Sequence, residues 1–374
     1  MRFGMGIILI YALPMSLPIT VVCGLSRSAT MSAGRDLLAG RSAARLVAHC
    51  LDQLQVGLVS RSVTDAQGQV EAALIELVHD CVSCTLREDV LPTLMRMAAD
   101  PDVDAVVLVL PEAVEPIGFL ENFMLVTDQH GRTTSDVCHV EAVVTVANPP
   151  ELVPTLSSDE TLIDRGLHVG DEDDRGIADL LAGQLECADL VVAPAATAQE
   201  RALLQLLNPE ATIVEQAPPR LEPIFNFART TARTSPAHID HLAETCRIDD
   251  AWRVQWRSHR PLHPLRLYEA LEVIADVALR GKGYFRIASR PEVVVEWDSV
   301  GGQLRLGAPA TEVSSQEAQL QFVGLSDRAY AISDVLDAAQ LTDAELAAPT
   351  SIDISESDPF RDIWRSAGLE AEED

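Results

Sequence analysis

A pair of cysteines three residues apart is the part of this sequence best suited to chemistry. Cys81 and Cys84 precede a stretch with helical spacing at residues 86–99, so we expect them where a loop turns into a helix. Two thiolates at this spacing can hold one tetrahedral zinc ion or form a redox pair, and a helix N-terminus favours either role by lowering thiol pKa values. Two buried, inert thiols would show the same spacing.

The charge of the chain restricts its partners. Its 374 residues include 57 acidic and 28 basic side chains, which give a net charge of −29. Because binding to phosphates needs a basic surface, we expect no direct nucleic-acid binding. Lys282 is the single lysine, which argues against lysine-based Schiff-base chemistry and against a lysine phosphate clamp in the N-terminal half.

The cysteine count and the hydropathy pattern suggest a compartment. Seven cysteines are an odd number scattered through a long chain, unlike the disulfide framework of a secreted protein, so a cytoplasmic location is expected. Residues 1–16 are interpreted as a leader or an incorrectly assigned start. No later apolar run reaches the ~20 residues of a membrane-spanning helix, and no membrane association is expected.

Short β-branched runs alternate with longer helical patterns between residues 17 and 220, which indicates an α/β fold with a mostly parallel sheet and flanking helices. The expected strands are residues 19–23, 56–63, 105–110, 142–146, 190–192 and 212–214. The expected helices are residues 34–55, 86–99 and 174–186.

A second, smaller α+β unit is expected at residues 252–350, after a linker at 221–251 that contains one short helix. It should contain a helix at 264–279, a turn at Gly301-Gly302 and strands at 283–289, 293–297, 303–306 and 319–323. Trp252 and Trp256, four residues apart, are expected to attach the linker to this unit. Residues 351–374 are expected to form a solvated acidic tail.

The cysteine segment resembles a known motif. Residues 76–91 are similar to the GCxCC and TLREDLL motif of CobW-type GTPases, with Asp80 at the glycine and Ser83 at the middle cysteine. Further similarity follows in order along the chain, at residues 143–146, 184–192, 207–209, 260–267, 281–291, Trp297 and Gly301-Gly302. The resemblance implies a P-loop NTPase-like domain, a CobW C-terminal domain and zinc bound at Cys81 and Cys84.

The nucleotide-binding motifs of that family are incomplete here. A P-loop has the pattern GxxxxGK[ST], whose lysine and hydroxyl serve phosphate and magnesium. Residues 24–32 take its place, with Gly24 retained, Arg27 at a glycine, Thr30 at the lysine and Ser32 at the end. Residues 194–197 stand where the family reads guanine with NKxD. The sequence therefore argues against ordinary GTP hydrolysis and makes GTP a doubtful cofactor.

Two functions are compatible with these features. The chain resembles most the actinobacterial CobW-like proteins that recruit a ribosome hibernation factor, which implies a zinc-responsive adaptor with a ribosome-associated partner. The alternative is a GTP-dependent zinc metallochaperone of CobW type. A third interpretation, a structural interaction protein with inert cysteines, stays open.

Overall fold

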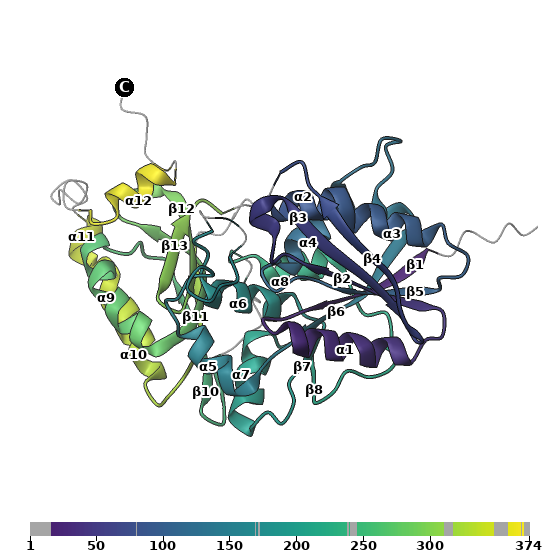
Figure 1. Ribbon diagram of the computed structural model, residues 1–374. Coiled ribbons are helices and arrows are strands. Elements are labelled where there is room, and N and C mark those ends of the chain that lie inside the picture. The colour runs from purple at the N-terminus through teal and green to yellow at the C-terminus, as the bar shows by residue number, and fades with distance from the viewer. Residues whose placement is uncertain are drawn as a thin grey trace, which may run out of the picture.

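The computed structural model describes residues 16–79, 81–168, 170, 173–237, 239, 245–309, 317–347, 358–367 and 369. They form two units, each built on one sheet (Figure 1). Among these residues, none of the helices has both the length and the apolar character needed to cross a bilayer.

The first sheet has eight strands in the order β4-β3-β2-β5-β1-β6-β7-β8. They are β1 (Leu17–Cys23), β2 (Ala44–Cys50), β3 (Leu58–Asp65), β4 (Gly68–Glu76), β5 (Ala105–Val109), β6 (Cys138–Val146), β7 (Leu190–Val192) and β8 (Thr212–Val214). Strands β2, β5, β1, β6, β7 and β8 run parallel to one another, whereas β3 at one side pairs antiparallel with both β2 and β4. The carboxyl ends of the six parallel strands therefore share one edge of the sheet, where α/β proteins carry their sites.

Helices cover both faces of this sheet (Figure 1). They are α1 (Arg27–Ala39), α2 (Val82–Thr85), α3 (Leu91–Ala98), α4 (Pro116–Leu125), α5 (Pro149–Leu156), α6 (Ile177–Cys187), α7 (Ala198–Leu207) and α8 (Phe227–Thr234). Two short 3₁₀ helices, η1 (Leu54–Val56) and η3 (Thr134–Asp136), and one π-helix, η2 (Leu86–Val90), complete this unit. Leu37 and Leu38 of α1 pack on the face that carries Leu46. Leu94 of α3 and Phe119 of α4 pack on the opposite face. Because helices bury both faces of the sheet, its central strands consist almost entirely of apolar residues such as Val and Leu.

The second sheet is antiparallel, with the order β13-β12-β11-β14-β10-β9. Its elements are β9 (Cys246–Ile248), β10 (Ala251–Ser258), α9 (Pro264–Val277), β11 (Ala278–Ile287), β12 (Arg290–Val300), β13 (Gln303–Gly307), β14 (Ala318–Leu325), α10 (Ala329–Ala339), α11 (Asp343–Ala347) and α12 (Arg361–Ser366). Helices α9, α10 and α12 bury one face. The other face meets α5, α6 and α7 of the first unit, where Val300 and Val323 join Leu181 in one apolar cluster.

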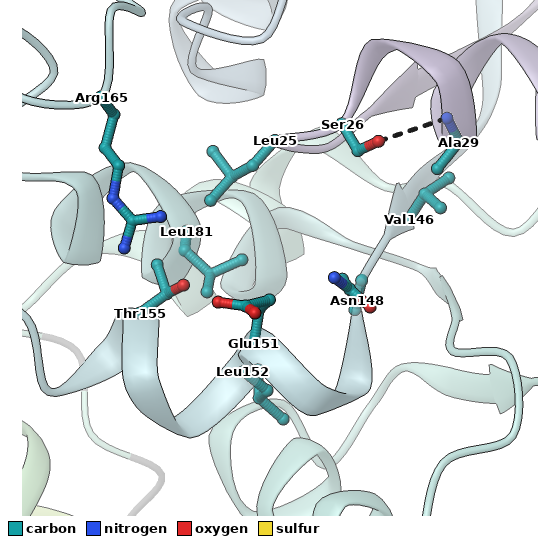
Figure 2. A pocket seen from close by; sticks show the side chains of 11 residues that line it. Leu25, Ser26, Ala29, Val146, Asn148, Glu151, Leu152, Thr155, Arg165 and Leu181 are labelled. Atoms are coloured by element: carbon teal, nitrogen blue, oxygen red, sulfur yellow. Dashed lines mark hydrogen bonds between the residues drawn. The ribbon is translucent and has the colours of Figure 1, made fainter.

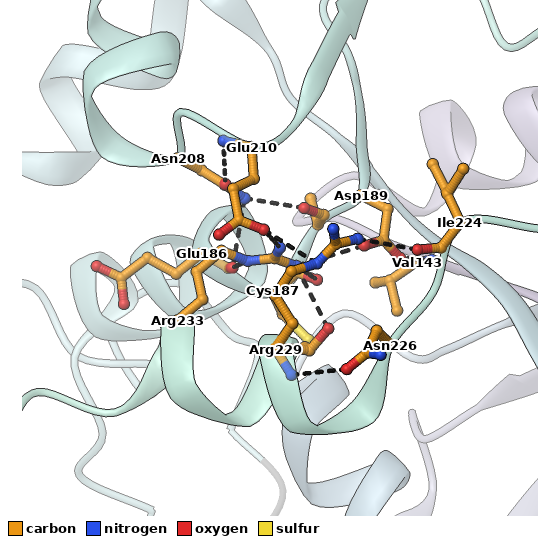
Figure 3. Close-up of polar contacts among 12 residues, drawn as sticks. Val143, Glu186, Cys187, Asp189, Asn208, Glu210, Ile224, Asn226, Arg229 and Arg233 are labelled. Atoms are coloured by element: carbon orange, nitrogen blue, oxygen red, sulfur yellow. Dashed lines mark hydrogen bonds and ion pairs between the residues drawn. The ribbon is translucent and has the colours of Figure 1, made fainter. Parts of the chain in front are cut away.

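A buried arginine ties α8 to the first unit (Figure 3). Arg233 donates to the backbone oxygens of Glu186 and Cys187 over 2.5 and 2.9 Å, and it lies 3.5 Å from Asp189. The one helix expected in the linker is therefore present, and it is packed against the first unit rather than free in solvent.

The fold class expected from the sequence is confirmed, and so are the strands at 190–192 and 212–214. The helix expected at 34–55 is wrong, because α1 ends at Ala39 and β2 follows after the turn at Gly40. Trp252 and Trp256 lie on β10, in the core of the second unit. The expected acidic tail is solvated only in part, because Phe360 and Trp364 are fully buried while most other residues of 358–367 are exposed. Residues 351–357 and 370–374 of that tail lie outside the described residues.

Candidate functional site

Cys81 and Cys84 lie together at the start of a helical run, as expected. Cys81 is the N-cap of α2, and its Sγ accepts a hydrogen bond from the backbone N–H of Cys84 over 3.3 Å. Cys81 is exposed and Cys84 is partly exposed. A side-chain hydrogen bond between the Cys84 and Cys81 thiols, followed by burial and the charges of Cys81 and Glu88, raises the pKa of the Cys84 thiol to about 11. The pair is thus accessible from solvent, and a metal ion that binds here must displace the proton of Cys84.

A buried polar network fixes the helical run behind the cysteines. Asp89 of η2 lies 2.7 Å from Nε2 of His49 on β2 and accepts a hydrogen bond from Arg61 on β3. Arg61 also donates to Thr93 of α3 and to Glu71 of β4. Burial raises the pKa of Asp89, but His49 and Arg61 outweigh this effect and bring that pKa below its usual range. This charge network anchors η2 to three strands and so orients the cysteine turn.

A pocket of about 460 Å³ opens beside the cysteines. Cys81 and Ser83 line one part of it, and Glu115, Asp173 and Arg175 line another. The Arg175 guanidinium binds both carboxylates, over 2.7 Å to Asp173 and 3.1 Å to Glu115. The hydrogen bond with Asp173, opposed by burial and helped by Glu115, raises the pKa of Arg175.

The chemistry of the donors fits a soft divalent metal. Two thiols that can ionise and that share a hydrogen bond provide half of a tetrahedral zinc shell. Within the described ranges, no three His, Cys, Asp or Glu side chains converge closely enough to hold a metal. Further ligands would come from side-chain movement, from solvent or from another molecule.

The residues expected at the P-loop position are directed elsewhere. Gly24 follows β1 with a φ of +153°, and a Cβ there would lie 2.5 Å from the carbonyl oxygen of Val146. The Arg27 guanidinium donates to the backbone oxygen of His49 over 3.3 Å. Thr30 is buried and its hydroxyl donates to Arg27 O, while Ser32 is exposed on α1. The side chains of Arg27, Thr30 and Ser32 therefore do not converge on a common point near Gly24.

A second pocket of about 310 Å³ lies next to this turn (Figure 2). Leu25, Ser26 and Ala29 contribute from the start of α1, and Asn148 and Glu151 contribute from the segment after β6. The Ser26 hydroxyl is already bound, because it caps α1 by accepting from Ala29 N over 3.4 Å. The lining of this pocket combines apolar side chains with a smaller number of polar ones, as in small-molecule pockets.

Sequence reasoning missed the acidic and basic side chains that share the pocket of Cys81. Glu115 precedes α4 and Arg175 precedes α6, so 60 residues separate them in the chain. Only the fold brings Glu115 beside Arg175. A run of acidic residues from 171 to 174, followed by an arginine, was the available signal.

The fold and the cysteine turn define a two-domain protein with a mostly parallel α/β unit and an antiparallel C-terminal unit. Residues 48–216 match the "CobW/HypB/UreG, nucleotide-binding domain", and residues 252–340 match the "Cobalamin synthesis protein cobW C-terminal domain". The chain therefore carries the nucleotide-binding and C-terminal domains of CobW-type proteins.

Relatives resemble the chain over most of its length. "Zinc chaperone Rv0106" of Mycobacterium tuberculosis is 26% identical, covering 93% of this chain and 94% of that protein. "Zinc-regulated GTPase metalloprotein activator 1" of Dictyostelium discoideum is 24% identical, covering 78% of this chain and 67% of that protein. Among solved structures, Zn(II)-bound YjiA GTPase from E. coli is 13% identical with a TM-score of 0.37, over 87% of this chain and 99% of that one.

Proposed function

We propose that this protein is a zinc metallochaperone that carries Zn²⁺ on Cys81 and Cys84 and delivers it to an acceptor protein. The observation that carries the proposal is the solvent-accessible thiol pair at the start of α2. The two cysteines are held together there, because the Cys81 Sγ atom accepts a hydrogen bond from the backbone N–H of Cys84. The printed names of two relatives, a zinc chaperone and a zinc-regulated metalloprotein activator, support it.

An open ligand set suits transfer better than storage. Structural zinc sites close their shell with four protein ligands, whereas two thiolates leave coordination positions free. A thiolate or imidazole of an acceptor can enter such a position before Cys81 and Cys84 leave. Because Cys81 is exposed, an acceptor can reach the metal without unfolding of the chaperone.

Zinc binding is proposed to be independent of GTP. The loop after β1 has no lysine, and Arg27 and Thr30 already hydrogen-bond to backbone oxygens. A phosphate chain in this loop would meet neither a lysine nor a free hydroxyl from Thr30. The metallochaperone is therefore proposed to bind zinc without GTP, and zinc measurements with and without GTP test this.

The first prediction concerns zinc stoichiometry. The reduced protein is expected to bind about one zinc per chain, and the double variant Cys81→Ser/Cys84→Ser is expected to lose it, because hydroxyls are poor zinc ligands. Elemental analysis and competition with a chromophoric chelator measure both, with and without GTP. Cys246→Ser is the matched control, since Cys246 is a partly exposed cysteine on β9 of the second unit.

Three outcomes would contradict the proposal. Zinc retained in the double variant would place the metal elsewhere. No zinc in either protein would make the cysteines packing residues. Zinc that binds only when GTP is present would restore nucleotide-dependent loading.

The second prediction concerns pH. Because the pKa of Cys84 is raised to about 11, this thiol is protonated at neutral pH and zinc must displace its proton. The apparent zinc affinity is therefore expected to increase with pH by about tenfold per unit for this thiol, until the pH approaches its pKa. Chelator competition between about pH 6 and pH 9, corrected for protonation of the chelator, measures the slope. A flat profile would remove Cys84 from the ligand set.

The adaptor interpretation, in which zinc status controls recruitment of a ribosome hibernation factor, rests on the sequence resemblance alone. No contact, pocket or surface of the described residues favours it. The names of the relatives favour the metallochaperone, which is the alternative raised by the sequence.

A further inference from the structure

Strand β4 is the outermost strand of the first sheet. Among the described residues it pairs with β3 alone, and residues 71–76 keep one uninterrupted register with residues 58–63. An outer strand presents unpaired N–H and C=O groups that another strand can bind, and proteins usually protect it with lysine, proline or a bulge. Strand β4 contains neither lysine nor proline, and the irregularity in its pairing lies at Val63 and Thr64, near the turn.

One face of the hairpin formed by β3 and β4 is not covered by α1. Ala48 of β2, Ser62 of β3 and Ala72 of β4 lie directly opposite one another, so their side chains share a face of the sheet. Ala48 is buried beneath α1, Ser62 is partly buried and Ala72 is exposed. Val70 and Leu74, on the same face as Ala72, are 53% and 60% exposed. Apolar side chains therefore line the outer edge of the sheet.

Exposed apolar side chains continue from this edge toward the cysteine turn. Val56 and Val78 are 72% and 77% exposed. They flank a backbone hydrogen bond of 2.9 Å, which Leu77 donates to Gly57. Cys81 follows Val78 by three residues. A chain segment bound along β4 would therefore end in the vicinity of the thiols.

The charges of the hairpin favour a basic partner. Its carboxylates are Asp65, Glu71 and Glu76, and Glu76 is exposed on the uncovered face. Its one cation, Arg61, points to the opposite face and binds Asp89. A second copy of this chain would bring the same carboxylates and a net charge of −29, so repulsion opposes pairing between copies. A strand that carries lysine or arginine is attracted instead.

We propose that the β4 edge surface, formed by Val70, Ala72, Leu74 and Val78, is the docking site for an extended segment of the zinc acceptor that contains basic and apolar side chains. The segment adds to β4 as a further strand, its apolar side chains cover Val70 and Leu74, and its cations approach Glu76. This inference rests on the proposed zinc-carrying function and extends it, because docking here places the metal ligands of the acceptor beside the cysteine pair.

The first experiment uses the full-length reduced chain and a synthetic nine-residue peptide of alternating lysine and valine, with binding measured by fluorescence anisotropy. One control peptide has the same sequence with N-methyl groups along both of its backbone edges, so it keeps the charge but cannot pair as a strand. The other has glutamate in place of lysine. Both controls should bind at least about tenfold more weakly. Equal binding of the N-methylated peptide would mean charge attraction alone and would overturn the inference.

A pair of variants tests the location. Leu74→Lys places a cation against the lysines of the peptide and should weaken binding by about tenfold. Tyr330→Lys is the matched control, because it adds the same charge at an apolar position of α10 that is 67% exposed. It should leave the affinity unchanged. Both positions are exposed, so circular dichroism and zinc content should stay as in the wild-type protein. Equal weakening by the two variants would place the peptide elsewhere.

Transfer of zinc gives a functional readout. The same peptide, extended by a segment with two cysteines, should take zinc from the loaded wild-type protein about tenfold faster than from Leu74→Lys, because docking raises the effective concentration of the acceptor thiols. Equal transfer rates would contradict docking at β4.

Two further measurements separate the possible failures. A dimer of the wild-type protein in sedimentation that Leu74→Lys dissociates would assign the β4 edge surface to a second copy and overturn the inference. Zinc content is measured in the same preparations. Absence of zinc from the wild-type protein would contradict the proposed function, whereas bound zinc without peptide binding would contradict only the docking site.

Discussion

Replacing Glu186 with alanine is expected to lower the free energy of unfolding by about 3–5 kcal/mol, because it leaves two buried cations without their shared carboxylate. Glu186 of α6 accepts hydrogen bonds from Arg280 over 2.8 and 3.3 Å, and Lys282 lies 3.8 Å away. Burial lowers the pKa of Lys282, and Glu186 offsets only part of this effect. The same carboxylate joins the first unit to β11 of the second.

The measurement can follow each unit separately. All four tryptophans lie in the second unit, so their fluorescence reports its unfolding in urea, while far-UV circular dichroism reports both units. In the wild-type protein the two signals should change together, and in Glu186→Ala they should separate. As the control, Glu160→Gln weakens a partly exposed ion pair with Arg165 and should cost at most about 1 kcal/mol. Arg280 also donates a hydrogen bond to Asp298 of β12. A loss this small in Glu186→Ala would mean that Asp298 alone satisfies Arg280.

Patterns of short range could be predicted from the sequence. Continuous Val and Leu runs identified β5 and β7, because strands buried on both faces carry no polar alternation. The helix at 264–279 was also confirmed, as α9, since its apolar spacing and Pro264 at its start are local signals.

Two strands of the first sheet, β2 and β4, escaped prediction for physical reasons. Apolar residues of β2 continue the helical period of α1 across the turn at Gly40, so one helix was expected where a helix and a strand occur. Strand β4 contains alanine and glutamate, which favour helices, and its outer positions are exposed. Pairing with β3, a tertiary effect, decides its conformation.

The candidate site likewise has one part that the local sequence predicts and another that only the fold brings together. The CxxC spacing and its place before a helix are local, and the structure puts both thiols where the sequence indicates. The ion pair of Glu115 and Arg175 depends on the crossover that brings α4 beside the segment before α6. Likewise, His49 and Asp89 are 40 residues apart and meet only across the folded sheet.

The last helix provides the second large prediction. Trp364→Ala is expected to destabilise the second unit by about 3–5 kcal/mol, because truncation of a buried tryptophan leaves a cavity. Trp364 is fully buried against Phe360, with ring centroids 5.6 Å apart. Its indole N–H donates to Asp358 over 2.8 Å, and Asp358 also accepts from Ser289. Residues 358–367 are thus attached to the core through two buried aromatic side chains, Phe360 and Trp364.

Two further variants separate packing from hydrogen bonding. Trp364→Phe keeps an aromatic ring but leaves Asp358 without the indole donor, so it should cost about 1–3 kcal/mol. Arg365→Ala alters an exposed neighbour on α12 and should cost less than about 1 kcal/mol. Urea unfolding followed by the remaining tryptophans gives the three values. Equal losses for Trp364→Ala and Arg365→Ala would show that α12 adds nothing to the core, whereas the expected order makes this helix the final layer that closes the second sheet.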